Sequence, residues 1–379
     1  MKYSLNLPSL SNLEKKYVLD VIKTGWLSSN GTHTQIFEKK FSRLINRKHS
    51  LAVQNGTAAL HLALKSLNCK TNDKVIIPNY TCVSNISSVA QCNAIPIIVE
   101  VEKETLGLDY NLVKKAIDKY KPKILQLVHV YGHPAKDTVK IIKLCKTKGV
   151  KVIEDASEAL GATLNKKKIG SFGEISVFSI RSEKMIGVGE GGMISTNDNK
   201  IYQKISLLAS RNAPYRKKKH PYWKKYFHLG EGYNYLLPHL LGAVGRAQIE
   251  RFSKDMLIRK KQVGNFYKKI FKNKDYSLTQ KIIKNSSPVF WLNSLFFKNL
   301  NKKEVIKLAH LLEKKGIEIR SGFWPMSDLK GFKSIYVKDK EKISKELFEK
   351  TLVLPSNVNL KYKDIIKFKK EIEKNIPKK

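Results

Sequence analysis

The sequence predicts an α/β fold in which a large domain with a mostly parallel central sheet precedes a smaller α+β domain. Between residues 50 and 210, short apolar runs alternate with segments whose apolar residues recur every three or four positions. This alternation is typical of parallel strands joined by crossover helices. From about Pro288 the pattern changes to short strands between helices. With 379 residues and 42% hydrophobic content, the chain can form two hydrophobic cores.

Short apolar runs bounded by polar or turn residues predict the strands of the large domain. We expect them at 50–54, 74–77, 96–101, 124–130, 151–154, 175–180 and 192–196. Amphipathic spacing predicts helices between the first five of these at 57–67, 83–91, 110–120 and 137–148.

Two further helical patterns, 238–252 and 254–271, would connect the two domains. In the second domain we expect strands around 290–297 and 317–319, with helices at 303–314, 343–351 and 361–374. The predicted division is a large domain at 1–250 and a small α+β domain at 251–379.

The formal net charge of +40 raises the hypothesis of a nucleic-acid or polyanion binder. However, only nine of the 72 basic residues are Arg, whose forked donors nucleic-acid readers favour. Lysine spread through every segment is more typical of solvated faces. We therefore expect no nucleic-acid partner, and a noncatalytic polyanion binder remains the alternative to an enzyme.

The four cysteines, Cys69, Cys82, Cys92 and Cys145, have no CxxC spacing and lie in or beside apolar segments. They predict reduced core thiols without a structural metal. Residues 1–15 form no basic and apolar leader, and no apolar stretch approaches the roughly 20 residues that span a bilayer. We expect a cytoplasmic protein without a membrane span.

Lys184 follows the apolar run 175–180 and precedes a glycine cluster at 187–192. A lysine that forms a Schiff base must present a neutral amine from a rigid, partly desolvated position. A buried strand would supply the rigidity, and the glycines would permit close approaches. The pattern is that of a lysine holding pyridoxal phosphate, and the alternative is a solvated surface lysine.

Residues that follow the predicted strands supply partners for such a lysine, because ligands bind at the carboxyl ends of parallel strands. Gly56 and Thr57 open a helix whose N–H groups could cradle a phosphate, or form an ordinary N-cap. Asp155 could pair with a protonated pyridine nitrogen, or cap a helix. Glu158 could face the phenolic oxygen of the same ring. Ser179 could give its hydroxyl to the phosphate, or bond to backbone.

No rival catalytic set is present, since the chain contains no GxxxxGK[ST], GxSxG or HExxH motif. His129 and His133 are four residues apart, but Gly132 and Pro134 would break a helix that could align them on a metal. We interpret the two histidines as a strand-end residue and a turn residue.

The sequence resembles the sugar aminotransferases of the DegT/DnrJ/EryC1/StrS group, which are fold type I pyridoxal phosphate enzymes. The resemblance runs from Pro8 to about Ile376. Its segments are 24–31, 55–60, 131–134, 154–158, the stretch around Lys184, 232–235 and 354–356. The Gly-Trp-Leu-Ser-Ser and Gly-Glu-Gly-Gly stretches are most similar to the perosamine synthase branch.

The resemblance implies a catalytic Schiff-base lysine at Lys184 and a homodimer with shared active sites. It implies cofactor contacts from Gly56, Thr57, Cys82, Asp155, Glu158, Ser179 and Lys184, with Asn234 reaching in from the neighbouring subunit. It places the sugar nucleotide beside Trp26, Ser28, Ser29, Phe323 and Trp324.

Two residues depart from the family pattern. Cys82 stands where the family usually stacks an aromatic ring on the cofactor, and a thiol offers less stacking area. Leu236 stands where the family commonly has an arginine, so any anion-binding task of that arginine must fall to another residue.

The implied reaction is transfer of an amino group from L-glutamate to a nucleotide-linked 4-keto-6-deoxy sugar, for amino-sugar or polysaccharide biosynthesis. Related enzymes that dehydrate sugars replace the lysine by histidine, so Lys184 argues for amination. Amination of a non-nucleotide cyclic ketone, such as a keto-inositol, is an alternative acceptor for the same chemistry.

Overall fold

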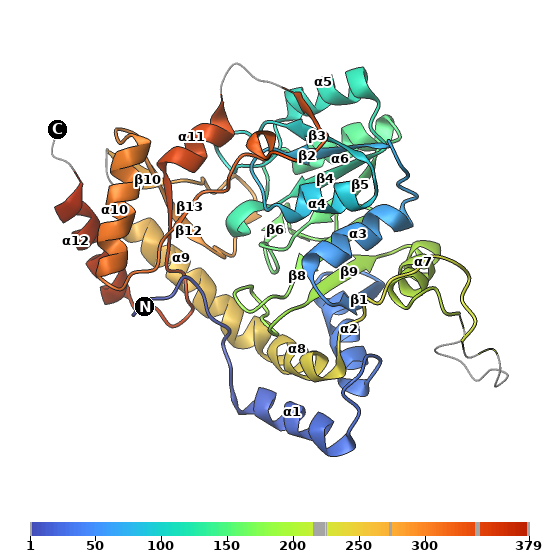
Figure 1. Ribbon diagram of the computed structural model, residues 1–379. Helices are drawn as coiled ribbons and strands as arrows, with labels where there is room; N and C mark the ends of the chain where they lie inside the picture. The colour runs from blue at the N-terminus through green and yellow to red at the C-terminus, as the bar shows by residue number, and fades with distance from the viewer. Residues whose placement is uncertain (1, 215–223, 225, 273–274, 338–341, 377–379) are drawn as a thin grey trace.

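Seven of the predicted strands form the body of one eight-stranded sheet. The computed structural model describes residues 2–214, 224, 226–272, 275–337 and 342–376. The strands of this sheet are β1 (His49–Val53), β2 (Lys74–Pro78), β3 (Ile95–Val99), β4 (Ile124–Val128), β5 (Lys151–Asp155), β8 (Ile175–Ser179), β9 (Gly192–Thr196) and β14 (Ile335–Val337). Their order in space is β1-β9-β8-β5-β4-β2-β3-β14 (Figure 1).

Most neighbouring strands of the large sheet run parallel, as the alternating sequence pattern predicts. β9 is the exception, because it pairs antiparallel with both β1 and β8. The loop that connects β8 to its antiparallel neighbour β9 spans residues 180–191 and contains Lys184 and most of the glycine cluster, so it holds the lysine beyond the carboxyl end of β8. The predicted α/β class with a mostly parallel central sheet is confirmed.

Helices cover both faces of the sheet, since successive side chains of a strand point to opposite sides. In β2, Val75 and Ile77 join a core with helices α3 (Gly56–Ser66), α4 (Ser84–Gln91) and α7 (Asn199–Ala209). Ile76 instead joins a core with α5 (Tyr110–Tyr120) and α6 (Thr138–Thr147). Both β2 faces are therefore buried, as expected for a parallel strand.

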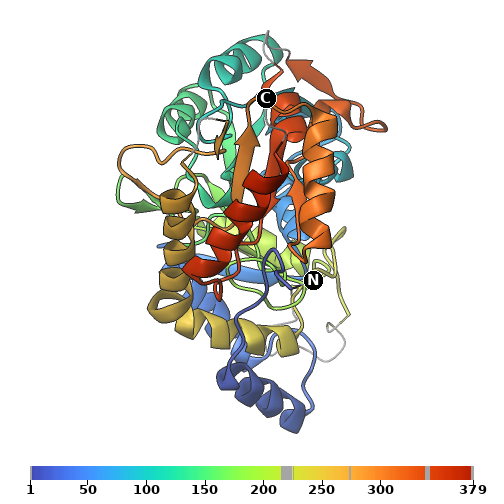
Figure 2. The same ribbon diagram turned by 90° about the vertical axis from the view of Figure 1, so that its left-hand side faces the viewer.

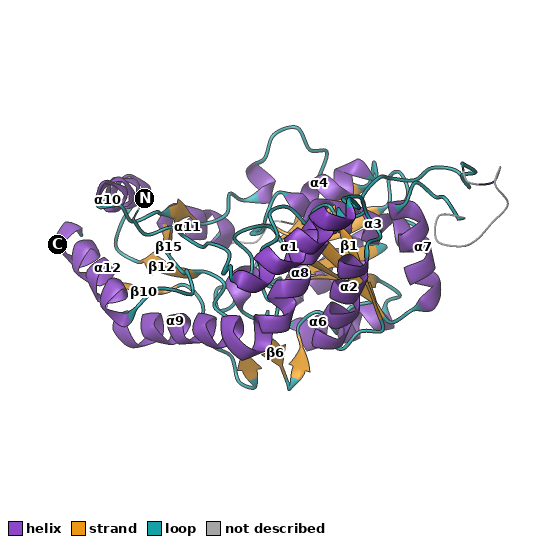
Figure 3. Cartoon of the chain, turned by 90° about the horizontal axis from the view of Figure 1, so that it is seen from below, coloured by secondary structure: helices purple, strands orange, loops and turns teal. Residues whose placement is uncertain are grey.

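The long helix α9 (Leu257–Ile270) leads from the large sheet to a second, smaller sheet. It follows α8 (His239–Arg251) after one π-helical turn at Phe252–Met256, and the two run diagonally beneath the sheet in Figure 1. Figure 3 shows the same pair from below, with the small sheet at one end.

The small sheet has the order β10-β12-β15-β13, with β10 (Tyr276–Leu278), β12 (Asn293–Phe297), β15 (Thr351–Leu354) and β13 (Arg320–Ser321). Its helices are α10 (Lys302–Lys314), α11 (Ile343–Lys350) and α12 (Tyr362–Asn375). Figure 2 shows α10 and α12 on the outside of this unit. The division at residue 250 stays a prediction, and β14, from beyond it, pairs with β3 of the large sheet.

Three details differ from the sequence-based expectations. The predicted strand 317–319 reduces to a single bridge between Ile317 and Tyr3, followed by β13. The predicted strand at 290–297 begins only at Asn293, since Phe290 has a positive φ of 52° that a strand cannot contain. Helices α1 (Asn12–Thr24) and α2 (Thr32–Leu44), which pack on α8, were not predicted.

A third sheet has three short strands, β11 (Ser286–Ser287), β6 (Thr163–Leu164) and β7 (Lys167–Lys168). In the part of the chain that the structure describes, no helix combines the length and the apolar character needed to cross a bilayer.

Candidate active site

A cavity of about 340 Å³ opens at the carboxyl ends of the large sheet's parallel strands, where a ligand is expected in such a fold. Lys184 and Asp155 both line it, together with the N-terminus of α3. The full lining is Asn55, Gly56, Thr57, Leu60, Thr81, Cys82, Ser84, Val128, Asp155, Ser157, Glu158, Ser179, Arg181, Glu183, Lys184 and Glu190. The structure thus brings together seven residues for which the sequence predicted cofactor contacts.

Lys184 and Glu158 form a nearly buried pair inside this cavity. Lys184 Nζ lies 3.3 Å from Glu158 Oε1, and the lysine side chain is 11% exposed. The backbone N–H of Tyr131 donates to Glu158 Oε2 at 2.8 Å, which fixes the carboxyl group. Burial raises the pKa of Glu158 more than the nearby ammonium lowers it. Glu158 is therefore able to hold a proton that an Asp or Glu in water would lose.

Asp155 is the last residue of β5, and its carboxylate is oriented by two donors. Ser157 N–H donates to Oδ1 at 3.1 Å, and Asn85 Nδ2 donates to Oδ2 at 3.0 Å. Asn85 is fully buried, and its amide also contacts Thr81 and Gln126. A buried carboxylate with fixed oxygens is suited to accept a proton-bearing ring nitrogen.

The opposite end of the cavity has the donors that a phosphate requires. Gly56 and Thr57 begin α3, and within the described residues only the Ala58 N–H of its first turn is capped by a side chain, that of Asn55, so the remaining N–H groups can receive an anion. Thr57 Oγ1 donates to Ser84 Oγ at 2.9 Å. A Cβ on Gly56 would lie 3.2 Å from Ser179 Cβ, so glycine allows α3 and β8 to approach closely here.

The functional groups that line the cavity fit pyridoxal phosphate. The cavity offers an amine for the aldehyde, a carboxylate for the ring nitrogen, and hydroxyl and N–H donors for the phosphate. Asp155 ends β5 and Lys184 lies in the loop after β8, and the two meet at one edge of the sheet because β5 pairs parallel with β8.

Cys82 corrects one expectation. Cys69, Cys92 and Cys145 are buried, as predicted, but Cys82 is exposed and lines the cavity. It lies in the loop between β2 and α4, where Asn79, Tyr80 and Thr81 are still buried and Cys82 is the first exposed residue, bordering the cavity. None of the residues that line the cavity is aromatic, which agrees with the loss of stacking area inferred at this position.

The residues assigned to the sugar nucleotide do not line this cavity. Trp26, Ser28 and Ser29 lie in the loop after α1, where the Trp26 ring is exposed and donates to Ser29 O. Phe323 stacks on Tyr131 with ring centroids 5.3 Å apart, and Trp324 packs on Phe348. Their substrate contacts stay a prediction.

Asn234 is exposed and pairs with Ser210 in an isolated bridge, outside the cavity of its own chain. Its contact with the cofactor stays a prediction. Leu236 forms a bridge with Val53 next to β1 and contributes to a core.

Sequence reasoning missed several residues of the site. Arg181 lines the cavity, and its guanidinium pairs with Glu190 at 3.0 Å and Glu183 at 3.5 Å. Asn85 and Trp291 also contact the predicted site residues, the indole of Trp291 lying under the Lys184 amine. Arg181 could have been found from its place three residues before Lys184, whereas Asn85 and Trp291 are distant in sequence.

His129, which follows β4, and Glu154, near the end of β5, form a fully buried hydrogen-bonded pair. His129 Nδ1 accepts from Ala135 N–H, so its Nε2–H donates to Glu154 Oε1 at 3.2 Å. Burial opposes ionisation of Glu154, but His129 and the N–H groups of Gly170 and Gly173 outweigh it and lower the Glu154 pKa. The described residues contain no cluster of three or more His, Cys, Asp or Glu placed to hold a metal.

Comparison with known proteins agrees with this geometry. The model of the DegT/DnrJ/EryC1/StrS aminotransferase family matches residues 8–373. A GDP-perosamine synthase from Vibrio cholerae is 34% identical over 352 residues, which is 92% of each chain. A GDP-perosamine synthase from Escherichia coli O157:H7 is 34% identical over 370 residues, covering 97% of this chain and 96% of the relative.

Among solved structures, the aminotransferase TlmJ from Streptoalloteichus hindustanus superposes with a TM-score of 0.88 at 20% identity, covering 99% of each chain. This similarity shows a shared fold. The family match over nearly the whole chain and the relatives above 30% identity together settle the family. This chain belongs to the DegT/DnrJ/EryC1/StrS aminotransferase family and is a pyridoxal phosphate-dependent sugar aminotransferase.

Proposed function

We propose that this enzyme moves the amino group of L-glutamate to a GDP-linked 4-keto-6-deoxy sugar, with Lys184 as its catalytic residue. The observation that carries the proposal is the meeting of Lys184 and Asp155 in one cavity with a phosphate-binding helix N-terminus. The choice of sugar nucleotide is supported by the 34% identity to two GDP-perosamine synthases.

Pyridoxal phosphate, when bound, would act as an electron sink for the substrate carbon that carries the amino group. Lys184 Nζ would move the proton between that substrate carbon and the cofactor. Asp155 would pair with the ring nitrogen and favour its protonated form. Glu158, whose pKa burial raises, would donate to the ring hydroxyl oxygen. Gly56, Thr57 and Ser179 would hold the phosphate.

The working unit is a homodimer, and Asn234 of each chain completes the phosphate site of its partner. The exposed position of Asn234, outside the cavity of its own chain, supports this arrangement. In the cell, we place the enzyme in the cytoplasm, where sugar nucleotides would be its substrates.

A screen of purified enzyme tests the proposal. L-Glutamate is incubated with GDP-, UDP- and dTDP-linked 4-keto-6-deoxy sugars and with a keto-inositol, and the aminated product is identified by mass spectrometry. We expect the GDP-linked ketone to give the highest kcat/KM. Preference for the keto-inositol would replace the acceptor, while leaving the amino-transfer chemistry in place.

Lys184→Ala tests the catalytic residue, with exposed Lys166→Ala as the matched control. The first variant should lose turnover and the covalently bound yellow cofactor, while both retain the wild-type circular dichroism spectrum. Activity of Lys184→Ala near the wild-type rate would refute the assignment. A colourless wild-type protein that binds nucleic acid with a steep salt dependence would favour the polyanion binder.

A further inference from the structure

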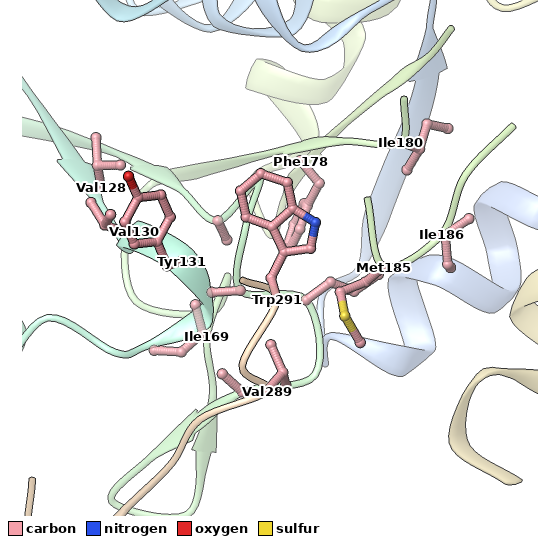
Figure 4. Close-up of a cluster of buried hydrophobic side chains, with 14 of the residues drawn as sticks. Val128, Val130, Tyr131, Ile169, Phe178, Ile180, Met185, Ile186, Val289 and Trp291 are labelled. Atoms are coloured by element: carbon pink, nitrogen blue, oxygen red, sulfur yellow. The ribbon is translucent and has the colours of Figure 1, made fainter. Parts of the chain in front are cut away.

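Trp291 is a buried tryptophan that reaches the candidate active site from the C-terminal part of the chain. It lies just before β12, is 5% exposed, and belongs to the same apolar core as Tyr131, Phe178 and Met185. Figure 4 shows its indole in the middle of this group, with Tyr131 on one side and Met185 on the other. Trp291 does not line the cavity itself, so it lies behind the wall that Lys184 forms.

The face of the indole lies against the reactive amine. Lys184 Nζ is 3.4 Å from the centroid of the Trp291 ring. Other described lysine–aromatic pairs have distances of 5.1 to 5.9 Å, and they lie outside this site. Tryptophan is the aromatic side chain that binds a cation most strongly, and the contact strengthens where water is excluded.

The edge of the same ring holds the backbone next to the lysine. Trp291 Nε1–H donates to Glu183 O at 2.7 Å. Asn6 Nδ2 donates to the same carbonyl at 2.5 Å, and its Oδ1 accepts from buried Lys260 at 3.2 Å. The peptide that precedes Lys184 is therefore fixed by two donors from distant segments of the chain.

The segment that carries Trp291 is itself tied to the group that faces Lys184. Val289 N–H donates to Gly132 O at 2.9 Å, and Leu292 N–H donates to Tyr131 O at 3.3 Å. A Cβ on Gly132 would lie 2.5 Å from Trp291 N, and its φ is +95°, so only glycine permits this approach. Because Tyr131 N–H also holds Glu158, the indole and the carboxyl that flank Lys184 are positioned by one docked segment.

We propose that Trp291 is a positioning residue for amino transfer: its ring face holds the Lys184 amine whenever that amine is free, and its ring N–H fixes the peptide from which the lysine extends. This inference rests on the proposed catalytic role of Lys184. The amine must leave the indole to react in the cavity and returns to it afterwards. Holding the free amine at one position reduces the number of conformations that the Lys184 side chain samples between reactions, and it keeps Nζ beside Glu158.

Two readouts test the inference, one of them without cofactor or turnover. In the apoprotein, the rate at which an acylating reagent modifies Lys184 is followed by site-resolved mass spectrometry, with exposed Lys166 as internal reference. In Trp291→Leu, which removes the ring, Lys184 should react about tenfold faster, the ratio that corresponds to about 1.4 kcal/mol. In the holoenzyme, kcat should fall about tenfold while KM for both substrates stays within twofold.

Trp291→Phe keeps a ring face but lacks the N–H donor. If Trp291→Leu does not fold, this variant tests the positioning role of Trp291. Because phenylalanine binds a cation less strongly than tryptophan, Lys184 should then react about threefold faster than in the wild-type protein. Phe266→Leu, which removes a ring that packs on Tyr362 away from the cavity, is the matched control and should change neither readout.

Wild-type acylation rates and kcat in both Trp291 variants would overturn the inference. A rise of KM with unchanged kcat would also overturn it, because it would place Trp291 in substrate binding. If Lys184→Ala retains activity, the proposed function itself fails. If Lys184→Ala is inactive while the Trp291 variants behave as wild type, only the role of Trp291 fails.

Discussion

Asn85 donates from Nδ2 to the Asp155 carboxylate at 3.0 Å, and the two residues are 70 positions apart in sequence. Thr81 Oγ1 donates to Asn85 Oδ1 at 2.7 Å, which fixes the orientation of the amide. The second Nδ2 hydrogen goes to Gln126 Oε1 at 2.8 Å. Asn85 thus has its donors and acceptor satisfied inside the core, and Asp155 is aimed at the cavity by a rigid partner.

Replacing Asn85 by Ala should impair the enzyme, although Asn85 does not line the cavity. The change leaves Asp155 Oδ2 and Gln126 Oε1 without a donor, and each buried unsatisfied group costs about 1–3 kcal/mol. We expect a lower melting temperature and a turnover about tenfold below wild type. Calorimetry and steady-state kinetics check both, with exposed Asn111→Ala on α5 as control. If Asn85 acts through Asp155, adding Asn85→Ala to Asp155→Ala should lower turnover no further.

Cys82→Phe should strengthen cofactor binding. The thiol is exposed and lines the cavity at a position where the resemblance expects a stacked aromatic ring. Aromatic stacking contributes about 0.5–1.5 kcal/mol beyond burial, so pyridoxal phosphate should dissociate up to about tenfold more slowly. The loss of cofactor absorbance after dilution measures the rate. Cys82→Ser should dissociate as wild type, and equal rates in all three proteins would mean that the ring does not lie beside residue 82.

The elements and site residues that sequence reasoning found are those whose signals are local. Asp155 and Ser179, which end β5 and β8, and Gly56, which begins the helix after β1, follow from short apolar runs and the polar or turn residues after them. Asn85 and Trp291 carry no such signal. An asparagine in the first turn of a helix and a tryptophan in an apolar run occur in many structural roles. The partner of Asn85 depends on the order of the strands, and that of Trp291 depends on where the C-terminal segment docks.

The same distinction explains the errors in secondary structure. Residues 290–297 have strand composition throughout, yet the backbone at Phe290 turns to a positive φ because the segment docks on Gly132, 158 positions away in sequence. Cys82 was placed in the core because the run before it is apolar. Whether the residue after a buried strand lies in the core or in a cavity depends on the neighbouring strands, which the local pattern does not contain.

Because Lys260 is buried, we expect the free energy of unfolding to depend on pH. Lys260 lies in α9 and bonds to Asn6 and to Ser356 O, and burial lowers its pKa to about 7. Between pH 7 and the ordinary lysine value of 10.5, the unfolded chain binds a proton at this side chain that the folded chain lacks. The free energy of unfolding attributable to Lys260 therefore rises with pH across this window, with a slope that approaches about 1.4 kcal/mol per pH unit.

Urea unfolding of the apoprotein at pH 7, 8 and 9 tests this dependence against Lys260→Met. The difference in unfolding free energy, wild type minus variant, should increase with pH, because methionine has no proton to lose. Exposed Lys269→Met on the same helix should show a constant difference. A constant difference for Lys260→Met as well would mean that Lys260 keeps its proton in the folded protein.

A mixing experiment tests the shared active site. If Asn234 completes the phosphate site of the partner, Asn234→Ala should bind pyridoxal phosphate weakly and turn over slowly, although this side chain is exposed and outside the cavity of its own chain. Mixing it with inactive Lys184→Ala should restore activity, because each mixed dimer has one site with both residues intact. Random exchange makes half of the dimers mixed, so about a quarter of the wild-type sites should recover. Mixtures no more active than the Asn234→Ala protein alone would place Asn234 and Lys184 in the same chain's site, or Asn234 in none.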